Sequence, residues 1–139
     1  MNEPGVGILD TNALILLDRL NASELPAEPT ISAVSLAELS VGPLATDDPR
    51  ERAIRQERLQ EVEAAFEPLA FDAASARAFG VVASSLRRAG RKPAARAFDA
   101  LIAATAVANE LPVYTCNPRD FDGIEGLRVV AIAHPDDDT

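Results

Sequence analysis

The chain has very little of several residue types that proteins use for chemistry. Its 139 residues include one cysteine, one histidine, one lysine and no tryptophan. Cys116 therefore forms no disulfide within the chain, and Cys116 with His134 alone makes no zinc site of the Cys/His type. A metal site in this protein would have to be built from oxygen ligands.

Long apolar runs and targeting signals are also missing. The longest stretch without a charged residue is 100–109, which is about half of a membrane span. The N-terminus shows no basic region followed by an apolar one, so no secretory signal is visible. These absences predict a cytoplasmic protein without a membrane segment.

The composition is that of a folded domain, with 47% hydrophobic and 25% charged residues. A chain of this length corresponds to one domain. We expect a single domain over residues 1–133, followed by a short acidic C-terminal tail over residues 134–139.

The net charge of −9 is distributed unevenly. Residues 73–98, called the basic segment below, carry six cations and no acid, whereas the rest of the chain has 7 cations against 22 acids. An acidic body argues against a protein that coats nucleic acid with its whole surface. The basic segment is either a solvated helix face or a local contact for phosphates.

Short apolar runs alternate with longer helical patterns along the chain, which predicts parallel strands joined by helical crossovers. The expected fold is a three-layer α/β/α sandwich around a parallel sheet of about five strands. Functional groups in such folds gather beyond the carboxyl ends of the strands. The expected strands are 6–9, 30–34, 68–71, 113–115 and 127–132, and the expected helices are 13–20, 35–41, 47–66, 72–90 and 93–109.

Acidic residues follow two of these strands. Asp10 comes directly after the first strand, where it is either a helix N-cap or part of a site. Asp120 and Asp122 follow the strand 113–115 in a segment with turn residues, so each has a structural alternative. Carboxylates in these places meet at one edge of a parallel sheet.

Two further acids lie on predicted helices. Glu38 has apolar neighbours but could also be an ordinary exposed glutamate. Asp99 lies in a helix that is almost entirely small and apolar, and an ionised carboxylate in a buried helix costs several kcal/mol unless it is compensated. Compensation comes from an ion pair with Arg96, three residues earlier, or from a functional site that Arg96 helps to orient.

Four carboxylates at one sheet edge require protons or a cation. Two like charges 4 Å apart repel by about 4 kcal/mol at an effective dielectric constant of 20. Oxygen-only ligands favour Mg²⁺ or Mn²⁺. Enzymes that hydrolyse phosphodiesters with the help of a metal ion use a hard ion that is held by few carboxylates.

The sequence resembles the PIN-domain family, specifically the VapC-type ribonuclease toxins of bacterial toxin–antitoxin pairs. The resemblance covers nearly the whole chain, and the last two of its four motifs are the most specific. The motifs are residues 9–12 (LDTN), 35–39 (SLAEL), 96–106 (RAFDALIAATA) and 115–121 (TCNPRDF).

This resemblance implies a metal-dependent catalytic site for Mg²⁺ or Mn²⁺ and a homodimer that is inhibited by a VapB-type antitoxin, in a heterotetramer or larger complex. The antitoxin's C-terminal segment would lie across the active-site groove and place an arginine near the carboxylates. Asp120 rather than Asp122 matches, because the family's acid directly precedes a phenylalanine. The implied catalytic and metal-binding residues are Asp10, Glu38, Asp99 and Asp120, with Thr11, Arg96, Thr115 and Asn117 assisting.

The hypothesis is therefore an endoribonuclease that leaves a 5′-phosphate and a 3′-hydroxyl, with tRNA or rRNA as the substrate that the resemblance implies. One alternative is a PIN-like module that has lost catalysis and only binds RNA or protein. Another is a phosphoaspartyl protein of the receiver or haloacid-dehalogenase type with Asp10 as nucleophile, although Asn12 stands where the latter has a second aspartate. The residues expected to hold RNA phosphates are Arg87, Arg88, Arg91 and Lys92.

Overall fold

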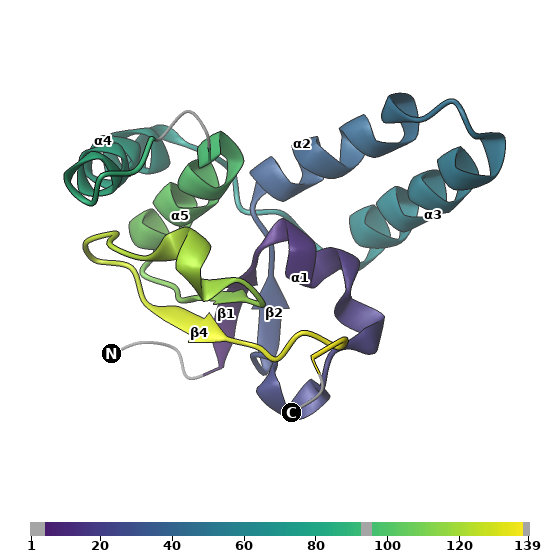
Figure 1. The fold of residues 1–139 in the computed structure, drawn as a ribbon, viewed down its shortest axis with the longest axis horizontal. Coiled ribbons are helices and arrows are strands. Elements are labelled where there is room, and N and C mark those ends of the chain that lie inside the picture. The colour runs from purple at the N-terminus through teal and green to yellow at the C-terminus, as the bar shows by residue number, and fades with distance from the viewer. Residues whose placement is uncertain (1–4, 93–95, 138–139) are drawn as a thin grey trace.

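The computed structural model describes residues 5–92 and 96–137, and its centre is a parallel four-stranded sheet (Figure 1). The order across the sheet is β2-β1-β3-β4, and all three neighbouring pairs are parallel. This confirms the α/β fold with a parallel sheet. The strands are β1 (Val6–Leu9), β2 (Glu28–Thr30), β3 (Val113–Thr115) and β4 (Val129–Ala131).

The sheet has four strands where about five were expected, because the segment 68–71 pairs at a single position. Ser32 and Leu69 form an isolated parallel bridge, in which the Leu69 amide donates to Ile31 at 2.8 Å. The pairing does not continue past Leu69, because its next partner, Ala33, already begins the following helix. The expected strand 30–34 is also shorter, since Ser32 already caps the next helix.

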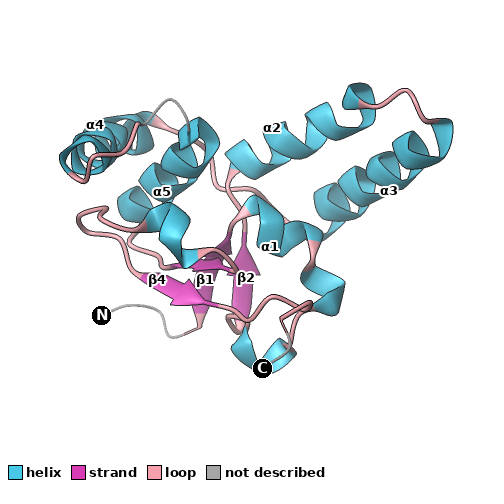
Figure 2. Cartoon of the chain, viewed as in Figure 1, coloured by secondary structure: helices cyan, strands magenta, loops and turns pink. Residues whose placement is uncertain are grey.

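Most of the expected helices are present, with local differences (Figure 2). Asp48 and Asp72 each accept from a backbone amide two or three residues later and so cap the helix that follows, as aspartates in this position commonly do. The expected helix 13–20 stops early and continues as a 3₁₀ turn, and the expected helix start at Pro93 lies outside the described residues. The helices are α1 (Thr11–Ile15), α2 (Ala33–Val41), α3 (Pro49–Ala65), α4 (Ala73–Arg88) and α5 (Ala97–Asn109), with 3₁₀ turns η1 (Leu17–Arg19), η2 (Ala22–Glu24), η3 (Gly42–Ala45) and η5 (Pro118–Phe121).

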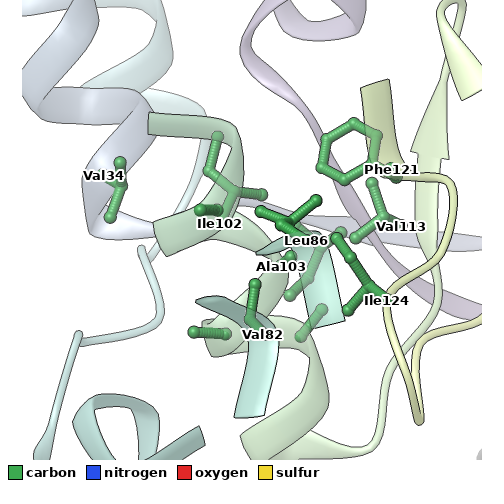
Figure 3. Close-up of a cluster of buried hydrophobic side chains, with 12 residues drawn as sticks. Val34, Val82, Leu86, Ile102, Ala103, Val113, Phe121 and Ile124 are labelled. Carbon is green, nitrogen blue, oxygen red and sulfur yellow. The ribbon is translucent and has the colours of Figure 1, made fainter. Parts of the chain in front are cut away.

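Helices cover both faces of the sheet. Successive side chains of a strand point to opposite faces, so Ile8 packs with α4 and α5 while Leu9 packs with α1 and α3. Figure 3 shows the first of these two clusters, in which Val82 and Leu86 of α4 meet Ile102 of α5. The sandwich architecture is thus confirmed by two cores, one on each side of the sheet.

Helix α5 is buried in the first core through small side chains. Ala100, Ala103, Ala104 and Ala106 are at most 1% exposed. Alanines allow neighbouring elements to approach closely, and α5 packs against α4 and α2. This packing fixes the first turn of α5, which carries Asp99, relative to the sheet.

The C-terminal residues up to Asp137 lie against the turns that follow α1. The Ala133 amide donates to Glu24 at 3.2 Å, and Arg19 pairs with Asp136 at 2.6 Å. Residues 138–139 of the expected acidic tail lie outside the described residues. Within the described part of the chain, no helix has the length and apolarity needed to cross a bilayer.

Candidate active site

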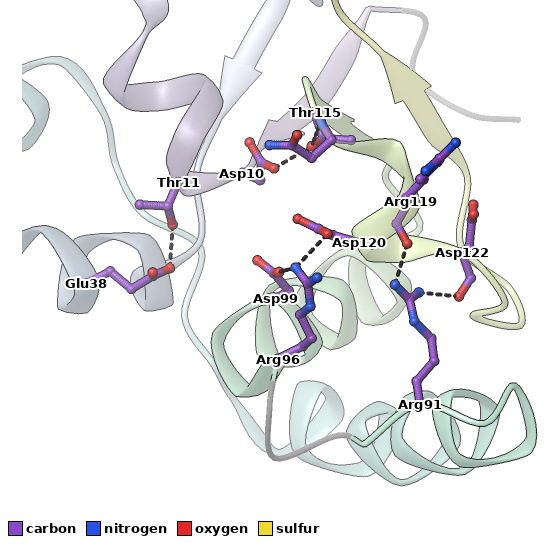
Figure 4. A network of polar contacts seen from close by, with 11 residues as sticks. Asp10, Thr11, Glu38, Arg91, Arg96, Asp99, Thr115, Arg119, Asp120 and Asp122 are labelled. Carbon is purple, nitrogen blue, oxygen red and sulfur yellow. Dashed lines mark hydrogen bonds and ion pairs between the residues drawn. The ribbon is translucent and has the colours of Figure 1, made fainter. Parts of the chain in front are cut away.

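Four acidic side chains face one region beyond the carboxyl end of the sheet (Figure 4). Asp10 directly follows β1, and Asp120 lies in η5, just beyond β3. Glu38 comes from α2 and Asp99 from the first turn of α5. Glu38, Asp99 and Asp120 line a hollow of about 300 Å³, so one acid that follows a strand and two acids from helices meet there.

Asp10 is both a helix cap and a member of this group. Its side chain is 3% exposed; Oδ1 accepts from the Ala13 amide at 2.9 Å, and Oδ2 accepts from the Thr115 hydroxyl at 2.5 Å. Burial raises the pKa of Asp10, the bonds from Thr115 and Ala13 oppose the rise, and the charge of Asp120 adds to it. The two interpretations of Asp10 are therefore compatible, because one oxygen caps α1 and the other meets β3.

Glu38 is held by the hydroxyl of Thr11. The Thr11 hydroxyl donates to Glu38 Oε1 at 2.5 Å, and its oxygen lies 2.9 Å from the Ser35 hydroxyl. Since the Thr11 hydrogen is directed at Glu38, Ser35 donates to Thr11. Burial raises the pKa of Glu38, the Thr11 bond opposes the rise, and the charge of Asp10 adds to it.

Asp99 has the most perturbed carboxyl group of the four. Burial is the largest cause that raises its pKa to about 6; the charges of Asp120, Asp10 and Glu38 add to the rise, in that order, and Arg96 opposes it. A carboxylate senses only charges that are close to it. The pKa of Asp99 therefore reports that all four acids share one electrostatic environment.

Arg96 bridges two of the acids. Its Nη1 lies 2.5 Å from Asp120 Oδ1 and 3.8 Å from Asp99 Oδ2. The ion pair with Asp99 that was an alternative in the sequence is thus present, but the shorter contact is with Asp120. Arg96 acts as the positive charge that this gathering of carboxylates requires.

The donor chemistry of the site fits a hard divalent cation. All four acids offer oxygen, and a guanidinium already stands between two of them as a cation. As the side chains stand in residues 5–92 and 96–137, no three acidic, histidine or cysteine groups are close enough to hold a metal ion. The fit therefore rests on the type and charge of the donors.

The segment after β3 distinguishes Asp120 from Asp122. Asp120 is one-fifth exposed and lines the hollow, whereas Asp122 is exposed on the outside of the loop (Figure 4). Asn117 contributes through its backbone, since its amide donates to Thr115 Oγ1 at 2.9 Å and its carbonyl accepts from the Asp120 amide at 3.0 Å. Thr115 thus joins Asp10 to the loop that carries Asp120.

The cations of the basic segment have different surroundings. Arg87 and Lys92 are exposed, and Arg88 pairs with Glu125 at 3.4 Å on the surface. Arg91 donates to the carbonyls of the loop after β3. A contact of these four side chains with RNA stays a prediction.

Two residues near the acids were missed in the sequence. Asn12 lines the hollow beside Glu38, and Ser35 supports Thr11 as described above. Asn12 could have been identified from the sequence, because it lies in the first helical turn after a strand-end aspartate. The sequence feature for Ser35 is weaker: it lies one helical turn before Glu38 on the same face.

Comparison with known proteins agrees with this geometry. The sequence matches the PIN domain family over residues 8–127. Ribonuclease VapC5 from Mycobacterium tuberculosis (strain ATCC 25618 / H37Rv) is 35% identical over 132 residues, which cover 93% of this chain and 95% of that protein.

Solved structures of toxin–antitoxin complexes have the same fold. The VapBC-5 structure from Mycobacterium tuberculosis has a TM-score of 0.80 at 33% identity and covers 92% of this chain and 99% of that one. The DNA-bound VapBC structure from Salmonella typhimurium has a TM-score of 0.65 at 27% identity, covering 91% and 97%. The chain therefore belongs to the PIN-domain family, among its VapC-type members.

Proposed function

We propose that this protein is a metal-dependent endoribonuclease of the VapC type, a toxin that a VapB-type antitoxin neutralises. The observation that carries the proposal is the placement of the acids at one edge of the sheet, where Glu38, Asp99 and Asp120 line one hollow and Asp10 is tied through Thr115 to the loop of Asp120. The ribonuclease relative with 35% identity supports the same reaction. Neither the phosphoaspartyl alternative nor the inactive module has support among the relatives described above.

Asp10, Asp99 and Asp120 would hold Mg²⁺ or Mn²⁺, with Glu38 acting directly or through water. When bound, such an ion polarises a phosphate oxygen and lowers the pKa of water. The products of the attack of water on the phosphodiester would be a 5′-phosphate and a 3′-hydroxyl. The substrate that the VapC resemblance implies is tRNA or rRNA.

The residues around the acids keep them in place. Thr115 and the Ala13 amide orient Asp10, and Thr11 orients Glu38. Arg96 is half-exposed at the rim of the hollow, where it adds positive charge beside an incoming phosphate. Because Asp99 has a pKa near 6 without metal, it holds its proton below that pH and offers a charged oxygen above it.

The cations of the basic segment would hold the RNA on either side of the cut. Arg87, Arg88 and Lys92 lie exposed at the end of α4 or just after it, whereas Arg91 uses both terminal nitrogens on the loop of Asp120. Contacts of this kind contribute affinity and salt dependence without sequence information.

A neutralising partner has a continuous surface to follow. A hollow between α1 and α3, lined by Leu14, Ile15 and Ile54 among others, adjoins a second one at Arg58. The second hollow shares Glu38 with the hollow of the acids. An antitoxin segment that packs apolar side chains into the first hollow and places an arginine at the acids would block the site. We also propose a cytoplasmic homodimer, joined by the antitoxin into a heterotetramer or larger complex.

The test is cleavage of RNA by the purified protein with Mn²⁺, with D99N as the inactivated variant and D122N as its matched control. Both substitutions remove one carboxylate charge, but only Asp99 lies in the hollow. We expect wild type and D122N to cut RNA and D99N to be inactive, with 5′-phosphate ends on the products. Full activity of D99N would overturn the assignment.

Calorimetric titration with Mn²⁺ separates this proposal from the inactive module. A working site binds the ion, and the heat disappears in D99N while D122N retains it. A wild-type protein that shows neither Mn²⁺ heat nor RNA cleavage, but still binds RNA, would be a binding module. The protein encoded by the gene directly upstream is the first candidate for a partner that suppresses cleavage.

A further inference from the structure

Arg91 contacts the backbone of the loop that carries Asp120. It follows α4, and its two terminal nitrogens donate to two different carbonyls, Nη2 to Arg119 at 2.6 Å and Nη1 to Asp122 at 3.0 Å (Figure 4). Arg119 directly precedes Asp120, and Asp122 follows it by two positions. The guanidinium therefore holds the loop on both sides of the acid.

The base from which Arg91 reaches the loop is itself fixed. Its amide donates to the carbonyl of Leu86 at 2.8 Å, and Leu86 is 2% exposed in the core beneath α4. The planar guanidinium presents its donors in a fixed fork, which a lysine ammonium does not reproduce. Two carbonyls at different positions of a turn are thus held at a defined separation.

The same loop has a second anchor on its inner side. Phe121, between the two carbonyls, is 1% exposed and belongs to the core cluster of α4 and α5. Farther along, the Glu125 amide donates to Ser85 Oγ of α4 at 3.2 Å. The end of α4 and the loop after β3 therefore form one unit, in which Arg91 binds the backbone on both sides of Asp120.

We propose that Arg91 is a positioning residue, which sets the place of the Asp120 carboxylate by clamping the loop, and is not primarily a contact for RNA phosphate. The proposal rests on the proposed ribonuclease function for its catalytic consequence, whereas the clamp itself does not depend on it. Both terminal nitrogens of Arg91 are used within the protein. This separates it from Arg88, whose partner Glu125 is an exposed side chain.

The experiment compares R91A and R91K with R88A, which removes one cation from the same segment. Amide hydrogen exchange at Asp120 and Asp122 reads the clamp directly, because these amides donate to Asn117 and Arg119 within the loop. Three measurements test the consequences of losing the clamp: Mn²⁺ affinity by calorimetry, the separate effects on kcat and KM, and the salt dependence of RNA binding.

In R91A we expect faster exchange at the two amides, a loss of about 10- to 100-fold in Mn²⁺ affinity and a lower kcat with nearly unchanged KM, as for other residues that orient metal ligands. R91K keeps the charge but loses the fork, so it should behave like R91A. R88A should instead weaken RNA binding and lower its salt slope by about 1, with loop exchange and Mn²⁺ affinity unchanged.

The opposite pattern would overturn the proposal. If R91A lowers the salt slope of RNA binding, leaves loop exchange and Mn²⁺ affinity as in wild type, and R91K restores binding, Arg91 is a phosphate contact. If wild type neither binds Mn²⁺ nor cuts RNA, the proposed function fails, and amide exchange in the variants still decides the clamp. R91K also serves where R91A is too unstable to measure.

Discussion

Replacing Asp99 by asparagine should make the metal-free protein more stable at neutral pH while it removes activity. The pKa of Asp99 rises from 3.8 to about 6 in the folded protein. One pKa unit corresponds to about 1.4 kcal/mol, so the shift amounts to about 3 kcal/mol. The side chain is 27% exposed, which makes this figure an upper value.

The sign follows from proton binding. Between pH 4 and 6 the folded state keeps the Asp99 proton that the unfolded state has lost, so the free energy of unfolding falls as pH rises and stays low above pH 6. Asparagine has the same shape and carries no charge at any pH. We therefore expect D99N to match wild type near pH 4 and to exceed it by up to about 3 kcal/mol at pH 7.5.

Urea unfolding with a chelator, followed by circular dichroism at a series of pH values, measures this difference. D122N is the matched control, since it removes the same charge from an exposed position and should show no such gain. Excess Mn²⁺ should reverse the order, because an ion at 1,000 times its Kd stabilises wild type by about 4.1 kcal/mol, which is more than the gain of up to about 3 kcal/mol in D99N. A difference between D99N and wild type that is absent at pH 7.5, or that does not shrink toward pH 4, would refute the reasoning.

Three further substitutions test the supports of the site. T115V removes the buried hydroxyl that donates to Asp10, so it should lower the free energy of unfolding by about 1–3 kcal/mol. It should also raise the pKa of Asp10 further, which an NMR titration would measure. An unchanged pKa of Asp10 would contradict the hydrogen bond. F121A should cost about 3–5 kcal/mol in urea unfolding and weaken Mn²⁺ binding, since Phe121 anchors the loop of Asp120; normal Mn²⁺ affinity would mean that the loop does not depend on it. D48A should cost about 1 kcal/mol through the cap of α3 and leave RNA cleavage intact, so a loss of cleavage would show that α3 matters to the site.

The fold and two of the acids could be predicted from local signals, whereas the choice of Glu38, and of Asp120 over Asp122, came from the family resemblance. A strand-end aspartate is visible in Asp10, and a lone carboxylate in an alanine-rich helix is visible in Asp99. The caps at Asp48 and Asp72 are equally local, and the structure has both. Parallel topology then brings distant strand ends to one edge without further information.

What could not be predicted depends on side-chain direction over long separations. Arg96 was expected beside Asp99, three residues away, but its shorter contact is with Asp120, 24 positions later. The packing of η5 decides which of the two acids lies closer to the guanidinium, and the spacing of residues in the sequence does not predict this packing. The contact of Arg91 with the loop has the same origin.

Arg96 has a consequence for how the protein is made. A chain emerging from the ribosome needs no metal ion at hand to bring its acids together, because it carries a tethered counter-ion of its own. We therefore expect the acidic edge to assemble before any metal ion binds.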